Sequence, residues 1–212
     1  MYHQSLEKLK NINCFIDEKV VIEEESKILF NSVLLGDTKI KKGAIIGPNS
    51  VIINSVIGEN SIIISSWICD SVVGDNCSIG PYANLRKDNF LFDSIRIGNF
   101  VELKNSVIKS HTKASHLAYI GDCSIGQNCN FGCGSITVNY DGKKKYHTEI
   151  GDNAFIGCNA NLVAPVKIED GSFIACGSTI TKDVPKNSLS IARSHQINKI
   201  DYLAKDENKC AE

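Results

Sequence analysis

Residues 109–119, KSHTKASHLAY, carry two of the chain's five histidines, His111 and His116. A neutral imidazole can accept a proton near pH 7, because its unperturbed pKa is about 6.5, and it is also a common zinc ligand. A zinc site built on this pair needs a third ligand. The remaining histidines do not supply one at a suitable spacing: His3, His147 and His195. We therefore expect no metal site, while acid–base chemistry and a purely structural role both stay open for the pair.

Nine cysteines form a second set of reactive groups. Their number is odd, no two are spaced as CxxC, and they lie in apolar rows rather than in loops. This usage is typical of reduced thiols in a reducing compartment, so we expect no disulfide framework. Three of the nine, Cys133, Cys158 and Cys176, hold equivalent positions in a repeat that runs through most of the chain.

The repeat is a run of apolar residues at every sixth position, over residues 16–52, 73–103 and 150–180. On an α-helix, at about 100° per residue, this spacing points successive side chains in three directions, so no single buried stripe forms. On a strand the even spacing keeps them on one face, but a strand of about 37 residues far exceeds the usual 3 to 10. The chain must therefore turn once in every hexad.

Turn-forming residues follow the apolar position, as in 47–49 (GPN) and 74–76 (GDN), and the fourth residue after it is small, as at Ser50 and Ala154. Both features suit a narrow prism in which three strands close a triangular coil of about 18 residues, with coils about 4.8 Å apart. The sequence predicts an all-β fold, a left-handed parallel β-helix of roughly nine coils over residues 15–185. Residues 1–14 are then a lead-in or the end of a linker helix, and residues 186–212 a short irregular or helical tail.

Two segments interrupt the repeat and are expected to project as loops near one another. The first is residues 109–119, and the second is VNYDGKKKYHTE, residues 138–149, which adds seven residues to the expected hexad. Subtracting those seven places Cys133, Cys158 and Cys176 in one column on consecutive coils. Such a column is either a wall for a long ligand or three ordinary small residues at a tight corner. A single vertical row cannot surround zinc tetrahedrally.

The charge balance excludes several partners. Lysine and arginine total 23 against 24 for aspartate and glutamate, so the net charge of -1 offers no field for holding nucleic acid or an anionic membrane. No apolar run reaches the roughly 20 residues of a membrane span, and the first ten residues lack the apolar core of a signal peptide. We expect a cytoplasmic protein that binds small molecules.

Five stretches carry a resemblance to a known family: IGPYANLR (79–86), IGNFVELK (97–104), KASHLAYIGD (113–122), NFGCGSITVNYDGKKK (130–145) and FIGCNANLVAPV (155–166). The sequence resembles the hexapeptide-repeat acetyltransferase domain of the bacterial bifunctional UDP-N-acetylglucosamine pyrophosphorylase and glucosamine-1-phosphate N-acetyltransferase. The resemblance implies transfer of acetyl from acetyl-CoA to the amine of α-D-glucosamine 1-phosphate, for UDP-N-acetylglucosamine and peptidoglycan synthesis. It also implies a homotrimer with each active site between subunits and no metal in acetyl transfer.

The same resemblance assigns roles to individual residues. His116 is the general base that takes a proton from the sugar amine as the amine attacks the thioester. A dianionic phosphate needs cations and donors, so the sugar-phosphate contacts fall on Arg86, Lys104, Tyr119, Asn130 and, from the loop, Lys145. The acetyl-CoA contacts fall on Cys133, Asn139, Tyr140, Cys158, Cys176 and Arg193, of which the last can meet a CoA phosphate. Alanine or serine is common in the family at the three cysteine positions.

The chain lacks the nucleotidyltransferase domain of the family's enzyme, so we expect no uridylyl transfer. Three alternatives stay open. The chain can be a hexapeptide acyltransferase with another amino-sugar acceptor, or a non-catalytic β-helix that serves as an oligomerisation or regulatory module. The third is a trimeric zinc carbonic anhydrase, whose HxxxxH spacing His111 and His116 share, although the third histidine that such a site requires is missing.

Overall fold

The computed structural model describes residues 13–202, and the regular elements in this range are all β-strands. They form three stacks of parallel strands, one for each side of a prism. Side 1 contains β1 (Phe15–Ile16), β4 (Val33–Leu35), β7 (Val51–Ile53), β10 (Trp67–Cys69), β13 (Asn84–Leu85), β18 (Ile136–Val138), β21 (Asn161–Val163) and β24 (Thr179–Ile180).

Side 2 contains β2 (Val21–Ile22), β5 (Lys39–Ile40), β8 (Val56–Ile57), β11 (Ser71–Val73), β14 (Asn89–Leu91), β19 (Thr148–Ile150) and β22 (Val166–Ile168). Side 3 contains β3 (Lys27–Ile28), β6 (Ile45–Ile46), β9 (Ile62–Ile63), β12 (Ser78–Ile79), β17 (Asn130–Phe131), β20 (Phe155–Ile156), β23 (Phe173–Ile174) and β25 (Leu189–Ser190). Two long strands, β15 (Arg96–Ile108) and β16 (Lys113–Ile125), bend around all three sides.

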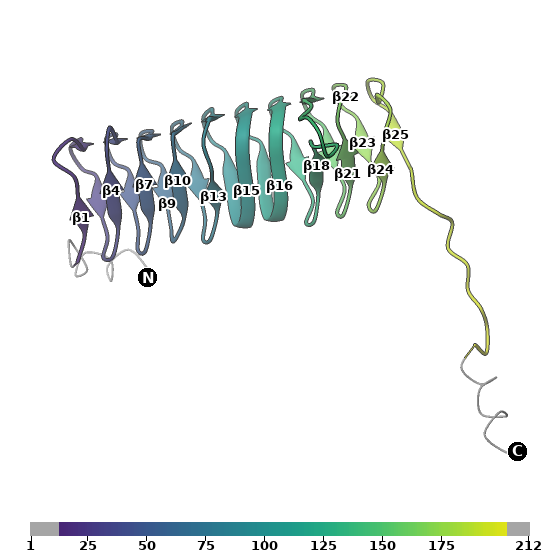
Figure 1. Cartoon of the computed structure of the whole chain (residues 1–212), viewed down its shortest axis with the longest axis horizontal. Coiled ribbons are helices and arrows are strands. Elements are labelled where there is room, and N and C mark those ends of the chain that lie inside the picture. Colours follow the sequence, from purple (N-terminus) through teal and green to yellow (C-terminus); the bar gives the residue numbers. More distant parts are fainter. Residues whose placement is uncertain (1–12, 203–212) are drawn as a thin grey trace, which may run out of the picture.

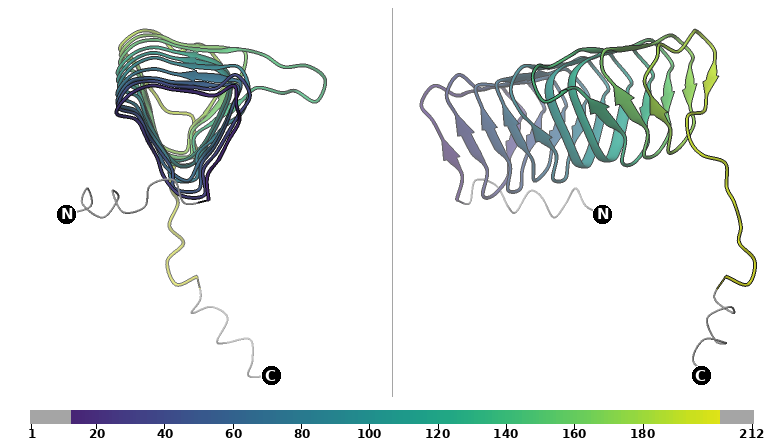
Figure 2. Two further views of the ribbon diagram at one scale, coloured as in Figure 1. Left: turned by 90° about the vertical axis from the view of Figure 1, so that its left-hand side faces the viewer. Right: turned by 45° about the vertical axis from the view of Figure 1, so that its right-hand side comes forward.

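The coils lie one behind another along the long axis of the molecule (Figure 1), and the end view is a triangle (Figure 2). The predicted left-handed parallel β-helix is confirmed, with about ten turns. The structure has more turns than the roughly nine expected because several sides contain five residues instead of six. Ile52 and Ile57 are successive inward residues, and both are fully buried. A single left-handed residue makes each of these short corners, as at Asn54 (φ 47°) and Asp70 (φ 44°).

The interior contains the residues that the repeat predicts. Ile40, Ile46 and Ile52 are fully buried, and the small residue between two of them, Ala44, is buried as well. The buried hydroxyl of Ser61 donates to the carbonyl of Gly74 at 2.8 Å and accepts the N–H of Cys77 at 2.8 Å, so its hydrogen bonds join two coils. A close-packed interior of this kind fixes the position of each corner relative to the next.

The loop expected at residues 109–119 is not present, so this prediction is wrong. These residues follow the regular coil, and β16 pairs with β15 along its whole length, with Ala114 opposite Ile97 and Tyr119 opposite Glu102. The apolar phase is kept because Ala114 and Ala118 are buried in the inward direction. Alanine fits the narrow interior without marking the row as strongly as isoleucine does.

The second expected loop is confirmed. β18 ends at Val138 and β19 begins at Thr148, and the chain between them projects from the prism (Figure 2). Asp141 holds this loop together: its Oδ1 accepts the backbone N–H groups of Lys143 and Lys144, both at 2.8 Å, and its Oδ2 accepts the hydroxyl of Tyr146 at 2.9 Å. The backbone N–H of Lys144, followed by that of Lys143 and the Tyr146 hydroxyl, lowers the pKa of Asp141.

The last strand pairing joins Ile174 and Ser190, and residues 193–202 leave the prism without regular structure (Figure 1). The expected linker helix within residues 1–12 and the end of the expected tail, residues 203–212, lie outside the described residues. Within residues 13–202 no helix is long and apolar enough to cross a membrane.

Candidate functional site

His116 lies at the corner between sides 3 and 1, directly before Leu117, whose backbone is left-handed (φ 32°). β15 and β16 pair so that Asn99 is its neighbour on the preceding coil. The Nδ1 of His116 lies 3.0 Å from the Oδ1 of Asn99. When Nδ1 carries the ring proton, it donates to this oxygen and the lone pair lies on Nε2. The contact fits the tautomer that a general base at Nε2 requires.

The three cysteines continue the column that starts at Asn99 and His116. Ala114 is paired with Phe131, Phe131 with Ile156 and Ile156 with Ile174, and the residue two positions after each belongs to the column. The column is therefore His116, Cys133, Cys158 and Cys176, and all three cysteines are exposed. Backbone bonds of 2.8 Å from Asn159 N to the Cys133 oxygen and from Gly177 N to the Cys158 oxygen hold successive coils together here. The predicted cysteine column is confirmed.

Arg193 lies at the far end of this column. The backbone of Ala192 is bound to the last coil, since its oxygen accepts Thr179 N at 3.0 Å and its N–H donates to Ser178 Oγ at 3.1 Å. The Cδ of Arg193 comes within 4.0 Å of the place that a Cβ on Gly177 would take. Gly177 follows Cys176, so a cation ends the row of thiols.

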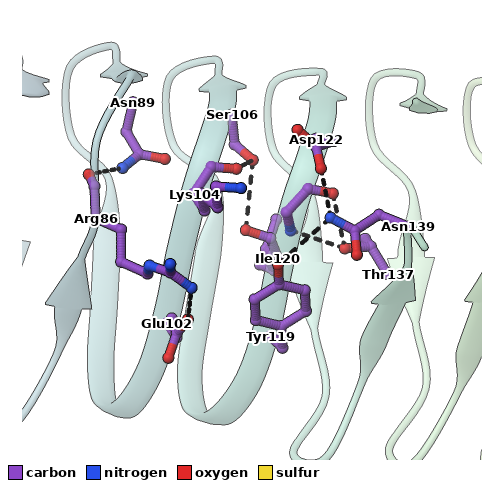
Figure 3. Close-up of polar contacts among 11 residues, drawn as sticks. Arg86, Asn89, Glu102, Lys104, Ser106, Tyr119, Ile120, Asp122, Thr137 and Asn139 are labelled. Carbon is purple, nitrogen blue, oxygen red and sulfur yellow. Dashed lines mark hydrogen bonds and ion pairs between the residues drawn. The ribbon is translucent and has the colours of Figure 1, made fainter. Parts of the chain in front are cut away.

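A cluster of cations occupies the corner between sides 1 and 2 (Figure 3). Arg86 pairs with Glu102 at 3.0 Å, and Lys104 lies on the next coil. The close ammonium of Lys145, followed by partial desolvation, lowers the pKa of Lys104, although Asp122 opposes this effect. Like charges held this close favour binding of an anion that neutralises them.

A buried polar network supports the cation cluster (Figure 3). Asp122 is 7% exposed, and one carboxylate oxygen accepts Asn105 Nδ2 at 2.6 Å. The other accepts Asn139 Nδ2, as Figure 3 shows. Asn139 Nδ2 also donates to the Tyr119 hydroxyl at 3.3 Å. The sequence interpretation missed Asp122 and Asn105. Both are left-handed corner residues (φ 50° and 47°), and nothing else in the sequence marks them.

The predicted residues do not all meet within one chain. Arg86, Lys104 and Lys145 gather at the end of side 1, whereas His116 lies at its beginning. The five residues of side 1 between the two corners span roughly 16 Å at about 3.3 Å per residue. Asn130 lies on side 3, because it pairs with Lys113 and Phe155. Tyr140 is exposed in the loop, where its hydroxyl donates to the Gly142 oxygen at 2.8 Å.

Among residues 13–202, no three histidine, cysteine, aspartate or glutamate side chains are grouped as metal ligands. His111 and His116 lie at successive corners of the prism, since both His111 and Leu117 are left-handed corner residues.

Two protein families match the sequence. The GlmU-like, C-terminal hexapeptide family matches residues 45–131, and the bacterial transferase hexapeptide family (six repeats) matches residues 19–54 and 147–182. The bifunctional protein GlmU of Clostridium tetani is 50% identical over 197 residues, which are 93% of this chain and 43% of that protein. GlmU of Halalkalibacterium halodurans is 48% identical over 194 residues, 92% of this chain and 43% of that protein. The chain belongs to the GlmU-like hexapeptide family.

This GlmU-like chain spans less than half the length of those curated relatives. Its fold also resembles that of an Arabidopsis UDP-N-acetylglucosamine acyltransferase, with a TM-score of 0.59, 18% identity, and coverage of 85% of this chain and 70% of that one. At this identity the likeness concerns the β-helix alone.

Proposed function

We propose that this chain is an N-acetyltransferase that moves the acetyl group of acetyl-CoA to the amine of α-D-glucosamine 1-phosphate. The observation that carries the proposal is the order of groups in the column: Asn99, His116, Cys133, Cys158 and Cys176, with Arg193 at the end. A proton acceptor at one end of the column and a cation at the other suit a long acetyl donor that has a thioester at one end and phosphate groups at the other.

The acetyl donor lies along this column. From His116 to Cys176 there are three coil spacings, or roughly 14 Å at about 4.8 Å per coil. The thioester lies at the His116 end and a CoA phosphate at Arg193, with the pantetheine arm across the small thiol side chains. Asn139 and Tyr140 contact the acetyl donor from the corner between sides 1 and 2, where the projecting loop begins.

The sugar phosphate binds at the cation cluster. Arg86 offers a planar fork of donors to the dianionic phosphate, and Lys104 and Lys145 add point charges. The phosphate removes the repulsion that lowers the pKa of Lys104. Tyr119 and Asn130 bind the sugar hydroxyls.

In the reaction, the amine nitrogen attacks the thioester carbonyl and His116 Nε2 takes its proton. The C–N bond forms, the C–S bond breaks, and the proton passes to the departing CoA sulfur. Asn99 holds the ring during this exchange. The chain needs no metal for these steps.

We propose that the active molecule is a homotrimer, as the resemblance to the hexapeptide acetyltransferase family implies, and the separation of the groups supports a site formed between subunits. His116 and the cation cluster lie at different corners of one prism. A second subunit must therefore bring its corner between sides 1 and 2, with the cation cluster, against the column of its neighbour. We keep the cytoplasm as the expected compartment, because reduced thiols such as those of Cys133, Cys158 and Cys176 suit a reducing environment.

The experiment measures free CoA thiol released from acetyl-CoA with glucosamine 1-phosphate, glucosamine, glucosamine 6-phosphate or no acceptor. Release that depends on glucosamine 1-phosphate supports the reaction and the substrate. Release with glucosamine 6-phosphate instead would move the proposal to another amino-sugar acceptor. If a folded trimer releases no CoA thiol with any of the acceptors, a non-catalytic module is favoured.

A further inference from the structure

Six of the cysteines that the structure describes form two groups with opposite surroundings, and Cys14 and Cys69 are half-buried. Cys77, Cys123 and Cys129 are buried, and desolvation raises the pKa of each thiol. Burial of this kind keeps a thiol protonated and inert. Cys133, Cys158 and Cys176 are exposed and lie in one column beside His116. Only the second group is open to a reagent that enters along the column.

Cys133 has a special place in this column. It lies one coil, about 4.8 Å, from His116, because Ala114 and Phe131 are paired and each is two residues before them. If the thioester of the donor reacts at His116, the sulfur of CoA must lie next to Cys133. The proposed reaction thus brings a protein thiol and a ligand sulfur together on every turnover.

We propose that Cys133 is a site of reversible S-thiolation by the symmetrical disulfide of CoA, and that the adduct closes the acetyl-donor groove. This inference rests on the proposed function, since that function places CoA in the column. Cys158 and Cys176, further from His116, line the path of the arm and react more slowly.

The step is a thiol–disulfide exchange. The thiolate of Cys133 attacks one sulfur of the CoA disulfide, and a Cys133–CoA disulfide bond forms while the original sulfur–sulfur bond breaks. One CoA leaves as the thiolate, which takes up the proton that Cys133 lost. The CoA disulfide is itself the oxidant, because one of its sulfurs is reduced to the CoA thiol as Cys133 is oxidised, and excess dithiol reverses the exchange.

Binding in the groove distinguishes this disulfide from other small disulfides. Arg193 lies beside Gly177 at the end of the column, where a cation holds a phosphate of the incoming CoA half. A bound reactant attacks at a high effective concentration, so CoA disulfide should modify Cys133 at least about tenfold faster than glutathione disulfide does.

The test uses the full chain, treated with CoA disulfide or glutathione disulfide at equal concentration. Intact mass gives the number of adducts, peptide mapping gives their position, and acetyl transfer is assayed before and after dithiothreitol. We expect one CoA adduct at Cys133, slower labelling in the presence of acetyl-CoA, and activity lost in proportion to the adduct and restored by the dithiol.

Three variants sharpen the test. Cys133→Ala should slow total labelling by CoA disulfide at least about fivefold, and Arg193→Ala should slow it while leaving labelling by glutathione disulfide unchanged. Cys69→Ala is the matched control: Cys69 is half-buried on β10, outside the column, and its thiol donates to Asp70, so its loss should change neither labelling nor activity.

The outcomes separate the two proposals. An enzyme that acetylates glucosamine 1-phosphate but gains no adduct from CoA disulfide overturns the inference and leaves the proposed function standing. Equal labelling of all three cysteines by both disulfides, without protection by acetyl-CoA, also overturns it. Protected labelling at Cys133 in a chain that acetylates no acceptor supports the thiolation site and contradicts the proposed acetyl transfer.

Discussion

Replacing Asn99 by aspartate should shift the pH dependence of acetyl transfer. Asn99 Oδ1 accepts the Nδ1 proton of His116 at 3.0 Å. A carboxylate in the same place keeps this bond and adds a negative charge next to the imidazole. The charge favours the imidazolium form of His116, so a higher pH is needed before the ring is neutral. Because the base must be neutral to accept a proton, the acidic limb of the kcat/KM profile should move to higher pH.

The expected size follows from exposure. His116 is exposed and Asn99 half-buried, and an exposed ion pair contributes about 0.2–1 kcal/mol. Because a factor of ten in a protonation equilibrium corresponds to about 1.36 kcal/mol, the acidic limb of the profile should move by about 0.15–0.7 pH units. The shift should be largest at low ionic strength, because salt screens exposed charges.

The assay is the pH profile of CoA thiol release for the wild type, Asn99→Asp and Asn31→Asp. Asn31 lies at the same corner four coils away, roughly 19 Å at about 4.8 Å per coil, and the change in net charge is identical. The pH profile of Asn31→Asp should not move, because the Debye length is about 10 Å at 0.1 M salt and a charge at a greater distance is largely screened. An active Asn99→Asp enzyme with an unmoved limb would refute the assignment of His116 as the base. Equal shifts in both variants would show a general charge effect instead.

Three further predictions follow from the site. His116→Ala should lower kcat by about 10²–10⁴-fold while sedimentation shows an unchanged trimer; retention of most activity would remove His116 from the base role. Arg86→Ala should raise the KM for the sugar phosphate about tenfold or more and that for acetyl-CoA far less, whereas an unchanged sugar KM would contradict the phosphate contact. The Asp141 carboxylate, with its lowered pKa, stabilises the loop above the ordinary pKa of 3.8 and loses this effect as the pH falls through its folded-state pKa. Hydrogen exchange corrected for intrinsic rates should therefore show weaker protection of the Lys143 and Lys144 amides at pH 3 than at pH 6, and a loss of this difference in Asp141→Asn.

The repeat determined the fold because its physical content is local. An inward residue at every sixth position and a small one at the corner describe a narrow prism directly, and burial of Ile40, Ile46 and Ala154 bears this out. The sequence predicts a loop at residues 109–119 because the inward positions there hold Ala114 and Ala118, which mark an apolar row less clearly than isoleucine does. The five-residue sides were not predicted for a related reason. One left-handed residue such as Asn54 shortens a side by one residue, while the residues on either side stay apolar.

By itself, the sequence determined the β-helix, the projecting loop and the cysteine column, since each follows from counting residues along a regular repeat. Only the tertiary structure showed that the column begins at Asn99 and His116, and that Lys104 and Lys145 meet at another corner over the buried Asp122. In a β-helix, side chains on different coils become neighbours according to the number of residues in every intervening side. Hydrogen bonds and charges act across these through-space contacts, so their partners emerge only when the whole path of the chain is known.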